Sequence, residues 1–125
     1  DKYAAVGRLK VYESTDIRDY NLSSGEEPFD LIVGDLSFIS LDKVLDKIAS
    51  LLSDSGAILI LLKPQFEVGK GNTDKGIVKD AKLIEEVAEK YKGILSSSNY
   101  KQVEIFDSSI KGGDGNRELF IYARS

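Results

Sequence analysis

The stretch PFDLIVGDLSFISLDKVLDKIASLLSDSGAILILLK, residues 28–63, predicts a strand, a helix and a second strand in succession. Continuous apolar runs at residues 28–35 and 57–63 are typical of strands that are buried on both faces. Between them, apolar residues recur at helical spacing behind Ser40, which is a suitable helix N-cap. These positions are Leu41, Val44, Leu45, Ile48, Leu51 and Leu52. A turn at SDSG is expected to end this helix, with Gly56 able to take the left-handed conformation.

The rest of the chain continues this alternation. Residues 8–13 predict an earlier strand, and residues 64–79 show no period, which indicates a long loop of a kind that is often functional. Asp80 is a suitable cap for a second helix. The apolar stripe of that helix is Leu83, Ile84, Val87, Ala88, Tyr91, Ile94 and Leu95. Two last strands, residues 101–109 and 118–124, are joined by a glycine-rich connection that is too short for a parallel crossover. We therefore expect an α/β fold with a mostly parallel sheet that ends in an antiparallel hairpin.

Composition narrows the chemistry. The 125 residues have the length of one domain and include neither cysteine nor histidine. This excludes disulfides, thiolate metal sites and imidazole bases within the chain, so proton transfer would rest on lysine, carboxylate, tyrosine or water. The net charge of −4 argues against a nucleic-acid clamp over the whole surface and leaves room for a local basic patch. With no apolar run long enough to span a membrane and no secretory leader, we expect a soluble, cytoplasmic chain and no membrane partner.

Ionisable residues lie where the apolar runs end. Asp16, Asp35 and Lys63 follow predicted strands, and Glu118 begins the last strand, which would place it at the same edge if that strand is antiparallel. Ligands of open α/β sheets bind at this edge. Two carboxylates that hold a partly buried lysine suit the activation of a hydroxyl nucleophile in a chain without histidine. The alternative is that each residue is a solvated or ion-paired charge at a strand end.

Four sequence strings carry a family resemblance. DLSFISL (residues 35–41), LLKPQFEVGKG (61–71), KGIVKD (75–80) and SSIKGGDGNRELF (108–120) resemble, in this order, the TlyA haemolysin-like branch of the FtsJ-type rRNA 2'-O-methyltransferases. The resemblance covers nearly the whole chain from about residue 13. It implies the Rossmann-like fold of class I S-adenosylmethionine-dependent methyltransferases and methyl transfer to a ribose 2'-hydroxyl. It also implies ribosomal RNA or ribosomal subunits as partners.

The same resemblance implies roles for individual residues. Such enzymes use a lysine, aspartate, lysine, glutamate tetrad, in which Asp35, Lys63 and Glu118 take the last three places. By analogy, Lys63 would activate or orient the hydroxyl, with Asp35 and Glu118 setting its charge and rotamer. Asp16, followed by Ile17, falls where the family presents a polar group to the adenine of the cofactor, and Asp35 lies on the cofactor side as well. Asp16 as a simple turn cap is a competing interpretation.

Several family features are not found in these residues. They are the amino-terminal RNA-binding domain, the first lysine of the tetrad, and the glycine-rich loop Asp-x-Gly-x-x-x-Gly-Gly that holds the cofactor. We therefore expect residues 1–125 to form the carboxyl-terminal portion of one FtsJ-like methyltransferase domain. The strand that ends at Asp35 would then be an apolar, unpaired edge, and the piece alone would be poorly active at best and either prone to aggregation or dependent on a partner.

Other interpretations stay open at this point. The lysines at 63, 70, 75 and 79 outnumber Glu67 and Asp74, an excess that suits an RNA backbone and equally a solvated loop. A non-catalytic RNA-binding or S-adenosylmethionine-binding module on the same scaffold is the main alternative function. A hydrolase that uses Ser37 with Lys63 is weaker, because the sequence shows no oxyanion-hole motif.

Overall fold

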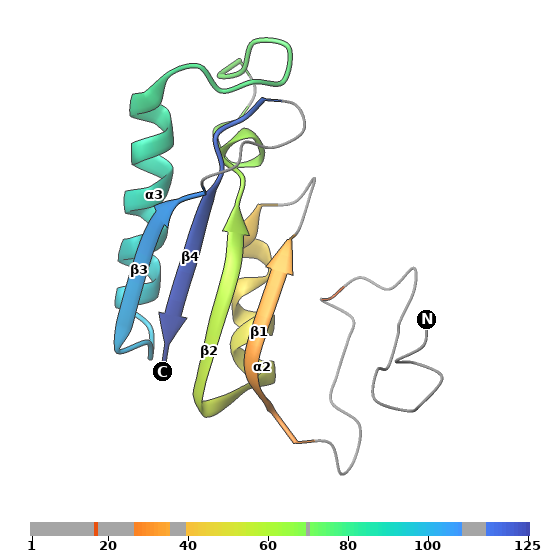
Figure 1. The fold of residues 1–125 in the computed structure, drawn as a ribbon, viewed down its shortest axis with the longest axis vertical. Coiled ribbons are helices and arrows are strands. Elements are labelled where there is room, and N and C mark those ends of the chain that lie inside the picture. The colour runs from red at the N-terminus through yellow and green to blue at the C-terminus, as the bar shows by residue number, and fades with distance from the viewer. Residues whose placement is uncertain (1–16, 18–26, 36–39, 70, 109–114) are drawn as a thin grey trace.

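The computed structural model describes residues 17, 27–35, 40–69, 71–108 and 115–125. In these residues, four strands form one sheet and two α-helices pack against it (Figure 1). The elements are β1 (Phe29–Asp35), the 3₁₀ turn η2 (Leu41–Lys43), α2 (Leu45–Leu51), β2 (Leu52–Leu62), the 3₁₀ turn η3 (Pro64–Phe66), α3 (Ala81–Ser96), β3 (Gln102–Asp107) and β4 (Leu119–Arg124). The strand expected at residues 8–13 lies outside the described residues.

The strand order is β1-β2-β4-β3, so the last strand of the chain lies between the second and the third. β1 runs parallel to β2, and β4 runs antiparallel to both β2 and β3, which confirms the antiparallel pairing expected for the last two strands. Because β4 runs against β2, its first residue, Leu119, pairs with the last residue of β2, Leu62. The carboxyl ends of β1 and β2 and the start of β4 therefore share one edge of the sheet.

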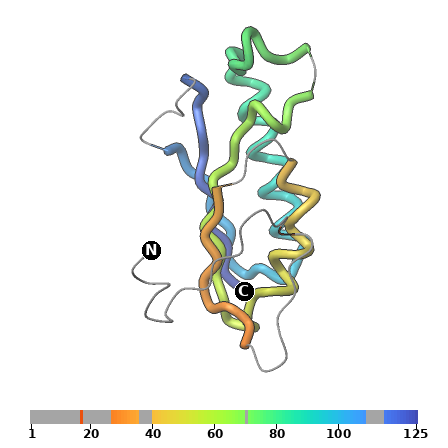
Figure 2. Tube along the Cα trace, turned by 90° about the vertical axis from the view of Figure 1, so that its right-hand side faces the viewer, coloured from red at the N-terminus to blue at the C-terminus, as the bar shows by residue number. Residues whose placement is uncertain are grey.

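The hydrophobic core lies on one face of this sheet. Figure 2 shows that α2 and α3 lie on the same side of the strands. Burial of the apolar side chains between sheet and helices is the main driving force for their association. The core includes Ile58, Ile60, Leu62, Leu119, Ile121 and Ala123 from the sheet, and Ile48, Ile84, Val87, Tyr91 and Leu95 from the helices.

The opposite face of the sheet is open in the described part of the molecule, and it is apolar. Leu31 and Val33 of β1 are 58% and 65% exposed. Beside them, Leu59, Leu61 and Phe120 line a shallow open depression. The expectation that β1 is buried on both faces is therefore wrong for the described residues, because both helices cover the other face.

The helix after β1 is shorter than its periodicity suggests. It opens as the turn η2, continues as α2 and ends at Leu51, so Leu52 already belongs to β2 and pairs with Phe29. The turn expected at SDSG is also wrong, since these residues lie within β2 and Gly56 is not among the glycines with positive φ. A Cβ at Gly56 would lie 2.7 Å from Cδ1 of Leu52, so the glycine permits a close approach within an irregular strand.

The second helix begins as expected. Asp80 is its N-cap, and its Oδ1 accepts a hydrogen bond of 2.9 Å from the backbone N–H of Lys82. The preceding segment is a loop that opens with η3, and Gly69, Gly71 and Gly76 have positive φ within it. Positive φ is a conformation that glycine adopts at little cost, which suits the turns of this loop.

Candidate active site

Lys63 and Asp35 meet at the shared edge of the sheet. Asp35 pairs in register with Leu61, so Lys63, two positions further along, lies on the same side of the sheet. The Nζ atom of Lys63 lies 2.5 Å from Oδ1 of Asp35. The lysine side chain is 13% exposed and the aspartate side chain 65% exposed. The pair therefore presents an accessible carboxylate and a lysine that is largely shielded from water.

Glu118 lies at the same edge. It immediately precedes Leu119, the partner of Leu62, so the antiparallel register places its backbone opposite Lys63. Glu118 is buried at 9% exposure, and the Nε2 atom of Gln65 lies 3.5 Å from its Oε2. Sequence reasoning did not single out Gln65, which directly follows Pro64 in η3. The structure thus brings Asp35, Lys63 and Glu118 to one edge, as expected from the strand ends.

Of the other predicted site residues, the structure describes only Ile17. Asp16, expected beside the adenine, and Ser37, the nucleophile of the hydrolase alternative, lie outside the described residues. Ile17 is partly buried and packs against the hydrophobic core. The cofactor-binding roles of Asp16 and Ile17 therefore stay predictions.

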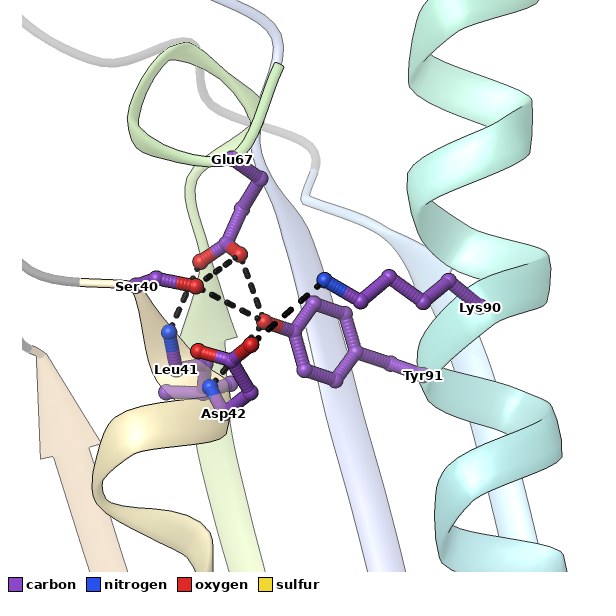
Figure 3. A network of polar contacts seen from close by, with 6 residues as sticks. All are labelled: Ser40, Leu41, Asp42, Glu67, Lys90 and Tyr91. Atoms are coloured by element: carbon purple, nitrogen blue, oxygen red, sulfur yellow. Dashed lines mark hydrogen bonds and ion pairs between the residues drawn. The ribbon is translucent and has the colours of Figure 1, made fainter. Parts of the chain in front are cut away.

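A second polar cluster, centred on Glu67, lies between this edge of the sheet and α3 (Figure 3). Its carboxylate accepts hydrogen bonds from the Ser40 hydroxyl at 2.7 Å, the Leu41 backbone N–H at 2.8 Å and the Tyr91 hydroxyl at 2.5 Å. Ser40 precedes η2 but makes no side-chain cap, so the expected N-cap bond is replaced by the bond to Glu67. Glu67 itself supplies the acceptor for the first N–H of that turn, from 26 residues away.

Tyr91 is the anchor of this cluster. It is fully buried, and its hydroxyl also accepts a hydrogen bond of 3.1 Å from the Asp42 backbone N–H. Burial, followed by the hydrogen bond to Glu67, raises the pKa of Tyr91 well above its ordinary value. The phenol therefore stays protonated and keeps donating to Glu67 at physiological pH. The sequence signal that could have indicated this contact is a tyrosine within an otherwise apolar helix stripe, because a buried tyrosine hydroxyl needs a hydrogen-bond partner.

Two of the four lysines between residues 63 and 79 form ion pairs that the structure describes. Lys79 Nζ lies 3.0 Å from Oδ2 of Asp74, and Lys63 is paired with Asp35. Lys70 lies outside the described residues. Contact between this loop and an RNA backbone stays a prediction.

The antiparallel last strand inserted beside β2 agrees with the antiparallel end of the sheet that the resemblance to class I methyltransferases implies. Residues 2–125 match the model of the FtsJ-like methyltransferases, and the chain belongs to this family. Among the described residues, no helix is both long and apolar enough to cross a membrane.

Individual relatives agree with this assignment. The chain is 38% identical over 117 residues to the 23S rRNA (cytidine-2'-O)-methyltransferase TlyA of Campylobacter jejuni, covering 92% of this chain and 44% of that protein. It is 34% identical over 119 residues to the 16S/23S rRNA (cytidine-2'-O)-methyltransferase TlyA of Mycobacterium tuberculosis, covering 94% and 44%. The chain thus spans less than half the length of these two relatives.

A solved structure is similar as well. The crystal structure of a candidate hemolysin from Lactococcus lactis superimposes with a TM-score of 0.87 at 31% sequence identity. The similarity covers 98% of this chain and 60% of that one. The fold described above is therefore shared by a chain whose length also exceeds that of the matched region.

Proposed function

We propose that the protein carrying this chain transfers a methyl group from S-adenosylmethionine to a ribose 2'-hydroxyl of ribosomal RNA. The observation that carries the proposal is the Lys63–Asp35 ion pair, with buried Glu118 at the same sheet edge. Two relatives that share at least 34% identity with the chain are named as rRNA cytidine-2'-O-methyltransferases, which supports the substrate class.

The described part of the edge fits a cationic cofactor. Asp35 offers an exposed carboxylate, and the apolar depression formed by Val33, Leu61 and Phe120 borders it. A negative group beside an apolar surface suits a ligand that combines positive charge with an apolar ring system. When bound, S-adenosylmethionine would supply an activated methyl group on a sulfonium. We propose that Asp35 lies on the cofactor side of the site and that Asp16 and Ile17 lie near the adenine.

The chain's own residues would act on the hydroxyl nucleophile. Lys63 Nζ would hold the 2'-oxygen, either by donating a hydrogen bond as an ammonium or by accepting the hydroxyl proton as an amine. In the first case the proton leaves to water, and in the second it stays on Nζ. Asp35 holds Nζ from one side, and Glu118 adds a buried negative group nearby. Methyl transfer is an in-line displacement, so this positioning is expected to contribute much of the rate enhancement.

The test compares Lys63→Ala with the wild type, in the full-length polypeptide that carries this sequence. Transfer of a labelled methyl group to ribosomal RNA is measured, together with S-adenosylmethionine binding by calorimetry. We expect transfer to fall by at least about 100-fold while cofactor affinity changes by less than about threefold. Lys101→Ala is the matched control, because Lys101 is exposed and precedes β3 at the opposite end of the sheet from Lys63. Full transfer by Lys63→Ala would contradict the proposal.

A wild-type protein that binds both S-adenosylmethionine and RNA but transfers no methyl group would favour the non-catalytic binding module instead. A pH profile of the rate in the wild type would separate the two roles of Lys63. A base must lose its proton to act, so the rate would rise with pH, whereas an orienting ammonium would lose activity as it deprotonates.

A further inference from the structure

The carboxylate of Glu67 joins the two chain segments that leave the sheet after Asp35 and after Lys63. We propose that Glu67 is a positioning residue for the Lys63–Asp35 pair, which it holds in a fixed geometry without touching the substrate. The inference rests on the proposed function, in which that pair acts on the hydroxyl.

The backbone after Lys63 transmits the position of Glu67 to the lysine. Within η3, the N–H of Phe66 donates to the carbonyl of Lys63 at 3.0 Å, and the N–H of Glu67 donates to the carbonyl of Pro64 at 2.9 Å. Pro64 restricts the backbone further by fixing its own φ. Lys63 and Glu67 are therefore the two ends of one short, hydrogen-bonded turn, and a shift of Glu67 is expected to displace Lys63.

The other side of the cluster belongs to the segment that follows β1. Glu67 accepts from the hydroxyl of Ser40 and from the backbone N–H of Leu41, and Leu41 is buried in the core. The ladder between β1 and β2 aligns the two strands only as far as the Asp35–Leu61 pair. Beyond that pair, the hydrogen bonds from Ser40 and Leu41 to Glu67 join the two departing segments.

Tyr91 ties the cluster to the core. Its ring is fully buried, so the hydroxyl that donates to Glu67 has a fixed position relative to the sheet. The three donors that converge on Glu67 require an acceptor with two oxygens, which an ionised carboxylate provides. A glutamine would turn an NH₂ group toward at least one of these donors. The three donors therefore require a side chain in which both terminal atoms are acceptors, as in the carboxylate of Glu67.

The test uses Glu67→Gln and Tyr91→Phe in the full-length polypeptide, assayed well below the melting temperature of each variant. A purely structural role predicts unchanged turnover per folded molecule. Positioning predicts that kcat for methyl transfer falls by about tenfold or more in Glu67→Gln, while KM for RNA and the S-adenosylmethionine Kd change by less than about threefold. Tyr91→Phe is expected to lower kcat in the same direction by a smaller factor. Glu86→Gln, an exposed change on α3, is the matched control and should leave kcat unchanged.

A second measurement does not depend on activity. The ¹H–¹⁵N signal of the Lys63 ammonium group is observable while a hydrogen bond and burial slow its exchange with water. We expect both Glu67→Gln and Asp35→Asn to weaken or shift this signal, and Glu86→Gln to leave it as in the wild type. If the wild type transfers no methyl group, the proposed function fails, and this signal still decides whether Glu67 positions Lys63. An unchanged signal, or a full kcat, in Glu67→Gln would overturn the inference; if that variant does not fold, the same two readouts in Tyr91→Phe decide.

Discussion

The Oδ1 atom of Asn116 accepts a hydrogen bond of 2.9 Å from the backbone N–H of Val78, which lies 38 residues earlier in the chain. The Nδ2 atom of the same side chain donates to the carbonyl of Gly76 at 2.9 Å. Asn116 is 1% exposed and Val78 is buried, so the bond between them forms away from water, whereas Gly76 lies at an exposed position. The Asn116 side chain therefore links the long loop after β2 to the segment that leads into Glu118 and β4.

Asn116→Ala is therefore expected to destabilise the protein. The substitution leaves the buried N–H of Val78 without this partner, and an unsatisfied buried group costs about 1–3 kcal/mol of unfolding free energy. The carbonyl of Gly76 lies at an exposed residue and can bond to water instead. Urea denaturation of the variant and the wild type measures the loss. Asn99→Ala, at an exposed position, should change the unfolding free energy by less than about 0.5 kcal/mol. Equal effects of the two substitutions would show that the Asn116 hydrogen bonds contribute nothing specific.

Asp35→Asn should separate activity from stability. The Asp35 side chain is 65% exposed, so water can replace it in part beside Lys63, which is 13% exposed, and we expect the loss of the pair to cost only about 1–2 kcal/mol of unfolding free energy. Loss of its charge should nevertheless lower methyl transfer by about tenfold or more, since Lys63 loses the carboxylate that holds it. Thermal denaturation and the methyl-transfer assay on one sample provide both values. Asp107→Asn, which breaks the exposed pair with Arg117, is the control and should preserve transfer; a large loss of stability in Asp35→Asn would contradict the argument.

Tyr91 predicts a stability change at high pH. Burial raises its pKa in the folded protein above the ordinary value of 10.0, whereas the unfolded chain keeps that value. The unfolded state therefore loses the proton first, so the stabilisation is complete below about pH 10 and is lost progressively as the pH rises above it. We expect the unfolding free energy to fall less steeply above pH 10 in Tyr91→Phe than in the wild type. Parallel curves would contradict a raised pKa at Tyr91.

The same substitution has a cost at neutral pH. Removing the hydroxyl takes a donor from Glu67 and an acceptor from the Asp42 N–H, so we expect Tyr91→Phe to lose about 1–3 kcal/mol of unfolding free energy. Chemical denaturation at pH 7 gives this value. Tyr122→Phe is a suitable comparison, because its hydroxyl accepts an exposed hydrogen bond from Arg124 and its loss should cost much less. A loss in Tyr122→Phe as large as in Tyr91→Phe would argue against a special role of the buried cluster.

Local patterns predicted the strands and the residues at their ends. The apolar runs indicated β1 and β2, and the short final connection indicated the antiparallel pair, so Asp35, Lys63 and Glu118 could be expected at one edge. Gly56 was misread because a glycine behind a helix usually marks its end, whereas here the chain enters β2 directly and the glycine avoids contact with Leu52.

The polar contacts could not be predicted in the same way. Glu67 bonds to Ser40 and Tyr91 across 27 and 24 residues of sequence, and Asn116 reaches back to Val78. Such pairs depend on how loops fold over the sheet, and no local periodicity reports that. Ser40 illustrates the difficulty, since its sequence position is that of a helix cap while its hydroxyl donates to a distant carboxylate.

The open face of the sheet leads to the last prediction. Leu31 and Val33 are more than half exposed on the edge strand β1, and Phe106 adds a 47% exposed ring across the sheet. Because contiguous exposed apolar surface beside a strand edge favours association, we expect the 125-residue chain to self-associate at micromolar concentrations. Val33→Lys should shift the sedimentation profile toward monomer, since a charge on the apolar face of this edge strand is costly to bury. Asn99→Lys adds the same charge at an exposed position outside the strands and should leave association unchanged; a wild-type chain that is already monomeric would contradict the prediction.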